Sequence, residues 1–153
     1  FQNTDLKFSD KYVTISDGGS SKIKYYAAGE GVVKSAPATI KFPTPDVSFD
    51  LDEAQLAMIL RTAAVLKASD VSIAGDGSNL KVVVSDKKND TANAYEMSIG
   101  STDKVFSANL KIENLKMLPG DYTVEVSSKK ISKFTNKASD LSYFVAIEAD
   151  SEF

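Results

Sequence analysis

The chain has 153 residues, of which 42% are hydrophobic, and a formal net charge of −3. It contains no Cys, His or Trp, which excludes a disulfide scaffold, a Cys/His zinc site and a Cys or His nucleophile–base pair. No apolar run reaches the roughly 18 residues that a membrane-spanning helix needs, so we expect no membrane partner.

Residues 1–28 carry three short segments typical of strands, at 6–8, 12–15 and 22–28. The second segment ends at Asp17-Gly18-Gly19, which is a strong turn signal. Three strands without a helix bury too little surface to form a domain alone. We therefore expect half of a domain to be missing, and these strands to pack on something outside the chain or on the following domain.

Residues 29–46 hold three of the four prolines and read as a stiff connector. Proline prevents regular ladder pairing and favours an extended chain. The segment also carries apolar side chains that a solvated linker would not need: Val32, Val33, Ile40 and Phe42. We expect this connector to lie on a protein surface.

The only convincing long helix is predicted over residues 51–66, with an apolar stripe at helical spacing. Asp50 stands at the expected N-cap and Glu53 follows three residues later, as in a capping box. The opposite face carries small or apolar residues and a single cation: Ala54, Ala57, Met58, Arg61 and Val65. Such a face is typical of a helix that lines a crowded channel, and a helix buried on most sides in an ordinary core fits it too.

Residues 47–153 predict one complete α+β unit. A strand at 47–49 precedes the long helix, and a second, short helix is expected at 112–118, before Pro119-Gly120. Further strands are expected at 71–74, 80–85, 93–100, 104–110, 122–127, 131–135 and 141–148. This order predicts two helices packed on antiparallel sheets.

Charge is unevenly distributed along the chain. Residues 104–137 contain seven lysines and three acids, a local excess of +4 in an acidic chain. This pattern is expected where one face meets phosphate, although lysine-rich turns would give it as well. Catalysis finds little support, because helix capping accounts for the acidic cluster Asp50, Asp52 and Glu53.

Two runs near the C-terminus resemble the sliding clamp of T-even-type bacteriophages: LKMLPGDY at residues 115–122 and YFVAIEADS at residues 143–151. Residues 54–61 and their approach, Phe42-Pro43, resemble the same family at the right separation. The resemblance implies the processivity-clamp fold, in which each subunit has two similar domains and three subunits close a ring around duplex DNA. Residues 1–28 would then be the C-terminal strands of a truncated first domain, 29–46 the interdomain connector, and 47–153 the second domain.

In that family the helices line the hole, so the resemblance implies four DNA-facing cations: Arg61, Lys67, Lys111 and Lys116. Ala64 departs from the family pattern, because the phage clamp has a second arginine there. For each lysine, an ordinary solvated side chain is the alternative.

The resemblance also implies a subunit interface between strand 22–28 and strand 93–100 of a neighbouring copy. Its residues would be Lys22, Ile23, Tyr25 and Tyr26 on the first strand, and Tyr95, Met97 and Ile99 on the second. Pairing within the chain is the alternative. A pocket for a partner peptide is expected beneath the connector, at Ile40, Phe42, Phe144 and Ile147, although Phe144 and Ile147 could equally be core residues.

The expected function is that of a DNA polymerase processivity factor without enzymatic activity, metal or cofactor. Its expected partners are double-stranded DNA, the C-terminal peptide of a DNA polymerase, an ATP-using clamp loader and, in the full-length form, two further copies in a homotrimer. The expected location is the cytoplasm of the infected bacterial host. The main rival is a non-enzymatic β-rich phage structural or protein-binding module; an enzyme using the acidic helix start is a weaker one.

Overall fold

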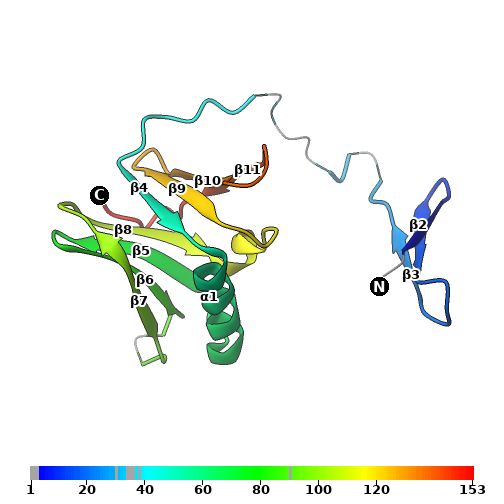
Figure 1. Ribbon diagram of the computed structural model, residues 1–153, viewed down its shortest axis with the longest axis horizontal. Coiled ribbons are helices and arrows are strands. Elements are labelled where there is room, and N and C mark those ends of the chain that lie inside the picture. The colour runs from blue at the N-terminus through cyan, green and yellow to red at the C-terminus, as the bar shows by residue number, and fades with distance from the viewer. Residues whose placement is uncertain (1–3, 30, 34–36, 38, 90) are drawn as a thin grey trace. The chain divides into compact units, whose positions relative to one another are not determined.

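The computed structural model describes residues 4–29, 31–33, 37, 39–89 and 91–153. The chain divides into two compact units, Phe1–Ile40 and Lys41–Phe153 (Figure 1). Parts of the predicted first-domain segment 1–28 and of the connector 29–46, namely residues 1–3, 30, 34–36 and 38, lie outside the described residues, as does residue 90. The boundary between the units falls within the predicted connector, residues 29–46.

The first unit contains an antiparallel sheet in the order β1-β2-β3. Its strands are β1 (Asp5–Phe8), β2 (Tyr12–Ser16) and β3 (Lys22–Tyr26). The register aligns apolar residues in two rows on one face: Leu6, Ile15 and Ile23, then Phe8, Val13 and Tyr25. The sequence pattern predicted all three strands, and β3 ends two residues earlier than expected.

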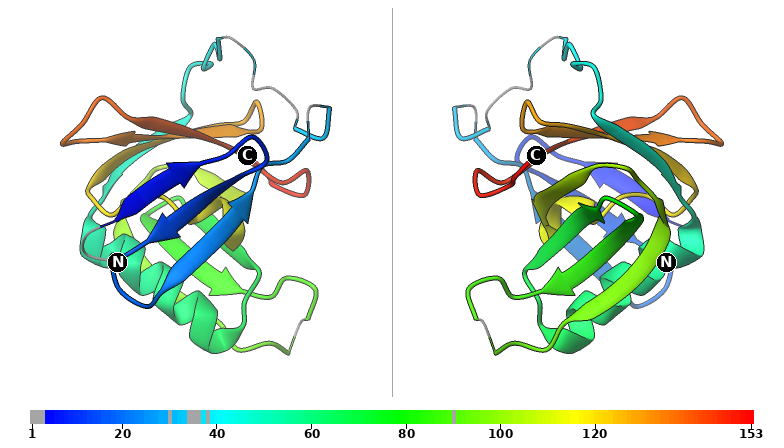
Figure 2. Two further views of the ribbon diagram at one scale, coloured as in Figure 1. Left: turned by 90° about the vertical axis from the view of Figure 1, so that its right-hand side faces the viewer. Right: turned by 90° about the vertical axis from the view of Figure 1, so that its left-hand side faces the viewer.

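The second unit contains two four-stranded antiparallel sheets, ordered β11-β10-β9-β4 and β7-β6-β5-β8, with helix α1 along one side (Figures 1 and 2). Its elements are β4 (Val47–Leu51), α1 (Glu53–Leu66), β5 (Asp70–Asp76), β6 (Asn79–Ser85), β7 (Tyr95–Ser101), β8 (Val105–Lys111), the 3₁₀ turn η1 (Ile112–Leu115), β9 (Tyr122–Ser127), β10 (Ile131–Asn136) and β11 (Ser142–Ala146).

Both sheets and α1 share one core. Ile59 of α1 lines the same small internal space as side chains from each sheet, among them Leu51, Phe134, Ile73 and Leu110. No helix in the described residues is long and apolar enough to cross a membrane. The α+β class predicted from the sequence is confirmed, with a core between sheets and helix.

The N-terminus of α1 lies two residues later than predicted. Asp52, not Asp50, is the N-cap: its carboxylate accepts from the backbone N–H of Gln55 at 2.7 Å, and the Gln55 side chain accepts from Asp52 N–H at 3.0 Å. Asp50 still belongs to β4, where it pairs with Lys137 at 2.7 Å. Because β4 continues to Leu51, the backbone becomes helical only after Asp52.

The second predicted helix is wrong, and α1 is the one α-helix among the described residues. Residues 112–118 form only the four-residue 3₁₀ turn η1, whose N-cap, Lys111, makes no side-chain capping bond. One uncapped turn forms too few hydrogen bonds to offset the entropy cost of nucleating an α-helix. Pro119 also disfavours helical geometry at the residue before it, Leu118.

Candidate nucleic-acid interface

One face of α1 is exposed. Leu56, Ile59 and Ala63 are buried against the sheets. The opposite face is open to solvent in the described structure, at Ala54, Ala57, Met58, Arg61 and Val65. Burial of α1 on most sides, the alternative left open by the sequence, is therefore wrong for this chain, and a nearly uncharged helix face with one arginine is available to a partner.

An open hollow of about 360 Å³ lies between the C-terminal half of α1 and η1. We call it the α1–η1 hollow; it is lined by Leu60, Ala63, Ala64, Lys67, Ala68, Ile112 and Lys116. Lys67 is the C-cap of α1 and has a left-handed backbone conformation, with φ 53°. Two predicted DNA-facing cations, Lys67 and Lys116, thus flank one depression.

A second open hollow, of about 350 Å³, adjoins η1 and the β6–β7 loop. We call it the η1–loop hollow; it is lined by Ala68, Ser69, Lys88, Lys111, Ile112, Glu113 and Lys116. Lys116 and Ile112 line both hollows. Lysines from three separate elements therefore surround one continuous stretch of surface.

Lys111 differs from the other cations of this surface. Its ammonium lies 2.5 Å from the carboxylate of Asp70, which is buried and also accepts a hydrogen bond from Ser69 Oγ at 2.6 Å. Burial alone raises the pKa of Asp70, but these hydrogen bonds outweigh it and hold the pKa below its ordinary value. The charge of Lys111 is largely neutralised by this pair.

The other cations of the surface are unpaired within the described part of the chain. Six ion pairs occur there, and none involves Arg61, Lys67, Lys88 or Lys116. Arg61 is exposed on α1 but lines neither hollow. Of the four predicted DNA-facing cations, the structure therefore brings Lys111 and Lys116 together at the η1–loop hollow and Lys67 and Lys116 at the α1–η1 hollow. Arg61 remains on the adjoining helix face.

Sequence reasoning missed Lys88. It stands in the β6–β7 loop beside Lys87, where the local sequence indicates only a solvated turn. Its proximity to Lys116 follows from the sheet register, which places Ser85 opposite Asp70 and Asp70 opposite Lys111. No local signal in the sequence carries that information.

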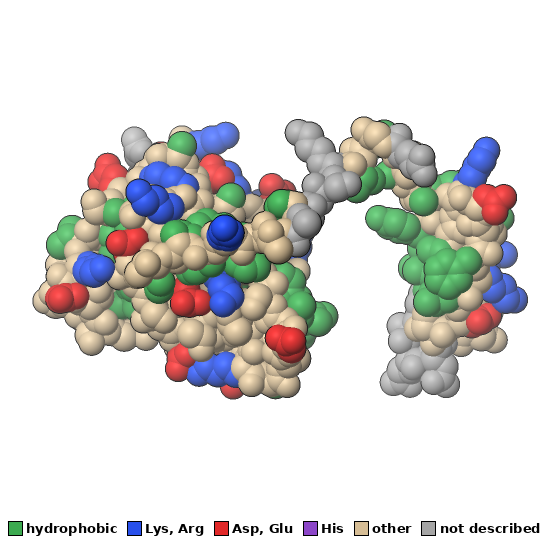
Figure 3. Space-filling model, turned by 90° about the horizontal axis from the view of Figure 1, so that it is seen from above, with side chains coloured by type: hydrophobic (Ala, Val, Ile, Leu, Met, Phe, Trp, Pro, Cys, Tyr) green, Lys and Arg blue, Asp and Glu red, His purple; other side chains and the backbone are tan. Residues whose placement is uncertain are grey.

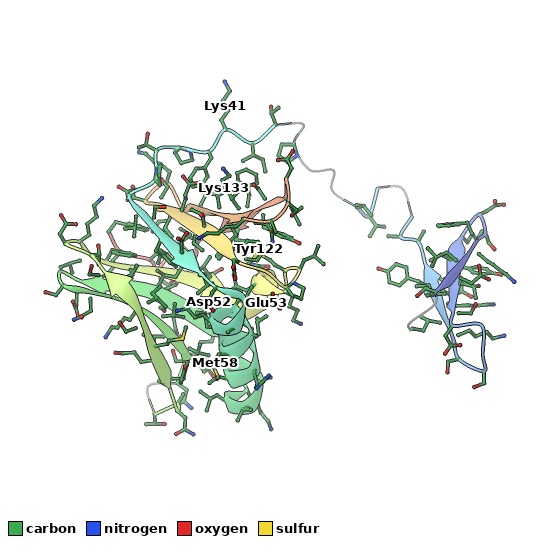
Figure 4. All side chains as sticks on the ribbon, in the orientation of Figure 1. Lys41, Asp52, Glu53, Met58, Tyr122 and Lys133 are labelled. Carbon is green, nitrogen blue, oxygen red and sulfur yellow. The ribbon has the colours of Figure 1, made fainter. Side chains whose placement is uncertain are left out.

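The acidic cluster at the start of α1 has structural roles. Asp52 caps the helix, and the backbone N–H of Glu53 donates to Asp121 at 2.9 Å. Figure 4 shows Asp52 and Glu53 at the end of α1 nearest Tyr122. No group of three or more His, Cys, Asp or Glu side chains suited to a metal ion occurs among the described residues.

The predicted interface strands are both sheet edges. β3 pairs only with β2, and β7 only with β6, among the described strands. The side chains Lys22, Ile23, Tyr25 and Tyr26 are exposed, whereas Tyr95, Met97 and Ile99 pack against the core of the second unit. Pairing within the chain accordingly uses one edge of each strand and leaves the backbone of the other edge unpaired.

The predicted peptide pocket is only partly assembled in the second unit. The rings of Phe42 and Phe144 lie 6.1 Å apart, and Phe144 is 36% exposed. Ile147 is a buried core residue, and Ile40 belongs to the first unit. Figure 3 shows hydrophobic side chains and lysines on the face crossed by the extended segment before β4. In Figure 4, Lys41 lies above Lys133 and points away from the strands.

Comparison with known proteins gives this surface a context. The model of the gp45 sliding clamp family, C-terminal part, matches residues 48–149. The sliding clamp of Vibrio phage KVP40 is 28% identical over 154 aligned positions, which cover 96% of this chain and 69% of that protein.

Solved clamps share the fold at low identity. The sliding clamp DnaN, DNA polymerase III subunit beta, of Bartonella birtlesii has a TM-score of 0.56 at 12% identity, over 95% of this chain and 41% of that one. Proliferating cell nuclear antigen (PCNA) of A. fulgidus, solved with the C-terminal region of FEN-1, has a TM-score of 0.56 at 13% identity, over 97% of this chain and 65% of that one. The chain thus spans less than two thirds of these solved clamps.

These matches confirm the DNA-clamp fold, with one α-helix in place of the expected two, and confirm the phage-clamp resemblance read from the motifs near the C-terminus. They also confirm that the chain is not an enzyme, since sliding clamps are non-enzymatic proteins. The chain belongs to the family of gp45 sliding clamps of bacteriophages, whose C-terminal part it contains.

Proposed function

We propose that the protein containing this chain is a DNA polymerase processivity factor, which encircles duplex DNA without sequence preference and tethers the replicative polymerase. The observation that carries the proposal is the set of cations at the exposed side of α1 and η1, which have no acidic partner among the described residues: Arg61, Lys67 and Lys116. All three fall within the region matched by the clamp family.

The chemistry of this surface suits a sliding contact. Lysine and arginine attract phosphates, which carry no sequence information, and each neutralised phosphate releases counterions. The rest of the exposed α1 face is small and apolar, at residues such as Ala57 and Val65, and offers no polar group to read base edges. A few separated cations on a smooth face would hold DNA loosely enough for movement along it.

The proposal extends to partners and location. The sheet edges of β3 and β7 would pair between copies in a homotrimer of the full-length protein, through backbone hydrogen bonds. Phe42 and Phe144 would take the C-terminal peptide of a DNA polymerase, as a PCNA of the same fold was solved with the C-terminal region of FEN-1. A separate clamp loader would open the ring, in the cytoplasm of the infected bacterial host.

Processive DNA synthesis tests the proposal directly. The double variant Arg61→Gln/Lys116→Gln should shorten the products of a phage replicative polymerase on a long primed template, and increasingly so as salt is raised. The double variant Lys11→Gln/Lys129→Gln removes the same charge from exposed positions that line neither hollow, and should leave product length unchanged. Equal product lengths for the two double variants would refute a DNA-facing role for α1 and η1.

A further inference from the structure

Lys88 occupies a defined position although it lies in a loop. Its backbone N–H donates to Asp86 Oδ1 at 3.0 Å, and the N–H of Asn89 donates to the Asp86 carbonyl at 3.1 Å. These bonds form a turn directly after β6. The exposed side chain of Lys88 lines the η1–loop hollow opposite η1.

The neighbouring lysine ties this loop to the C-terminal segment. Lys87 Nζ lies 2.6 Å from Asp150 Oδ2, and the other oxygen of Asp150 accepts from Asn109 Nδ2 at 3.2 Å. A single exposed ion pair contributes little, but here Asp150 is held at once by Lys87 in the β6–β7 loop and by Asn109 within β8. Lys87 is therefore engaged within the protein, whereas Lys88 has no acidic partner among the described residues.

The charges around the η1–loop hollow do not cancel. Lys111 is neutralised by the buried carboxylate of Asp70, which leaves Lys88 and Lys116 against the exposed carboxylate of Glu113. Since Lys116 lines both hollows, the positive surface runs from Lys67, over η1, to the β6–β7 loop. An elongated polyanion lying along this line would meet Lys88 last.

We infer that Lys88 is a phosphate contact for duplex DNA. The Lys87–Asp150 ion pair holds it at the edge of the η1–loop hollow, at one end of the positive surface that begins at Lys67. The inference rests on the proposed function and deepens it, because it adds a third element, the β6–β7 loop, to the DNA path. Two observations support it. Lys116 and Ile112 line both hollows, and Lys87 is paired with Asp150 whereas the adjacent Lys88 has no acidic partner among the described residues.

Site-specific cross-linking tests this placement, since the chain contains no cysteine and each introduced thiol is unique. The variants Lys88→Cys, Lys116→Cys and Lys129→Cys would each carry a photoactivatable aryl azide and be mixed with a mixed-sequence DNA duplex at low ionic strength. Lys129, on the β9–β10 turn, is the control because it lines neither hollow. Cross-linking from 88 and 116 but not from 129 is the expected result.

The other outcomes separate the two proposals. Cross-linking from 116 alone would overturn the role of Lys88 and leave the proposed function standing. Cross-linking from none of the three, or equally from all three, would overturn the DNA path as a whole. The charge itself is measured with Lys88→Gln, which should reduce the salt dependence of DNA affinity, the slope of log K against log salt, by about 0.9. Lys129→Gln should leave that slope unchanged, and an unchanged slope for Lys88→Gln overturns the inference.

Discussion

The ammonium group of Lys111 lies 2.5 Å from a carboxylate, that of Asp70, whose side chain is only 1% exposed. The two residues are directly opposite each other on β8 and β5. Lys111 itself is 29% exposed, so the two partners have unequal access to water. This difference in exposure determines which of the two side chains can be replaced at a smaller cost in free energy of unfolding.

Removing Lys111 should destabilise the protein more than removing the charge of Asp70. Lys111→Met leaves a buried carboxylate without its countercharge, a situation that costs about 3 kcal/mol or more. Asp70→Asn leaves the lysine free to turn toward solvent, and the amide can still accept a hydrogen bond from Ser69. Urea unfolding of both variants measures the difference, and a larger loss for Asp70→Asn would contradict this account.

At low pH the Asp70–Lys111 pair should no longer contribute to the free energy of unfolding. The pKa of Asp70 is lowered in the folded protein, because hydrogen bonds from Lys111 and Ser69 outweigh the upward effect of burial. Its stabilising effect is therefore fully present above the unfolded-state pKa of about 3.9 and is lost as the pH falls through the lower folded-state value. The difference in free energy of unfolding between the wild type and Asp70→Asn should shrink in that acidic range, and a constant difference would exclude ionised Asp70 as its source.

The start of α1 offers a clean comparison of two aspartates. Asp52→Ala should lower the free energy of unfolding by about 1 kcal/mol, because it removes the acceptor for the Gln55 N–H. Asp50→Ala breaks only exposed contacts with Lys137 and Thr123 and should cost less. Thermal unfolding of the two variants ranks them, and the reverse order would contradict a larger contribution from the Asp52 cap.

Local patterns were sufficient for most of the elements. Residues 122–127 alternate apolar and polar side chains between turn signals, and β9 has those same bounds. The helix cap was misplaced because two aspartates two residues apart both satisfy the capping pattern, and only the extent of β4 chooses between them. The second helix failed because an apolar spacing over seven residues does not distinguish an α-helix from a 3₁₀ turn.

Less of the candidate site than of the fold could be predicted from the sequence. Arg61, Lys67 and Lys116 could be predicted as DNA-facing because the clamp resemblance implies that helices line the hole, and these residues lie on or beside predicted helical segments; their contact with DNA stays a prediction. The pairing of Lys111 with Asp70 spans 41 positions and depends on the register of β5 and β8, which local patterns do not fix. The same register brings Lys88 to η1, so the sequence could suggest neither the neutralised lysine nor the additional one.

Phe144 is the side chain on which peptide binding should depend most. It is partly exposed and faces Phe42 in the extended segment before β4. Phe144→Ala should weaken the binding of a polymerase C-terminal peptide at least about fivefold, since buried aromatic anchors commonly contribute more than about 1 kcal/mol. Val105→Ala, which shortens an apolar side chain that is 74% exposed on the other sheet, is the control for isothermal titration. Equal affinities for both variants would place the peptide elsewhere.

Ala64 marks a place where positive charge can be added to the proposed DNA path. It is exposed, and it lines the α1–η1 hollow together with Lys67 and Lys116. Ala64→Arg should raise the salt dependence of DNA affinity by about 0.9 in the slope of log K against log salt, the value for one further phosphate contact on duplex DNA. Ala64→Gln adds a long polar side chain without charge and should leave the slope unchanged. Because arginine fits an exposed helical position, both variants should unfold at nearly the same temperature as the wild type. An arginine variant with a wild-type slope would show that this side of α1 does not face DNA.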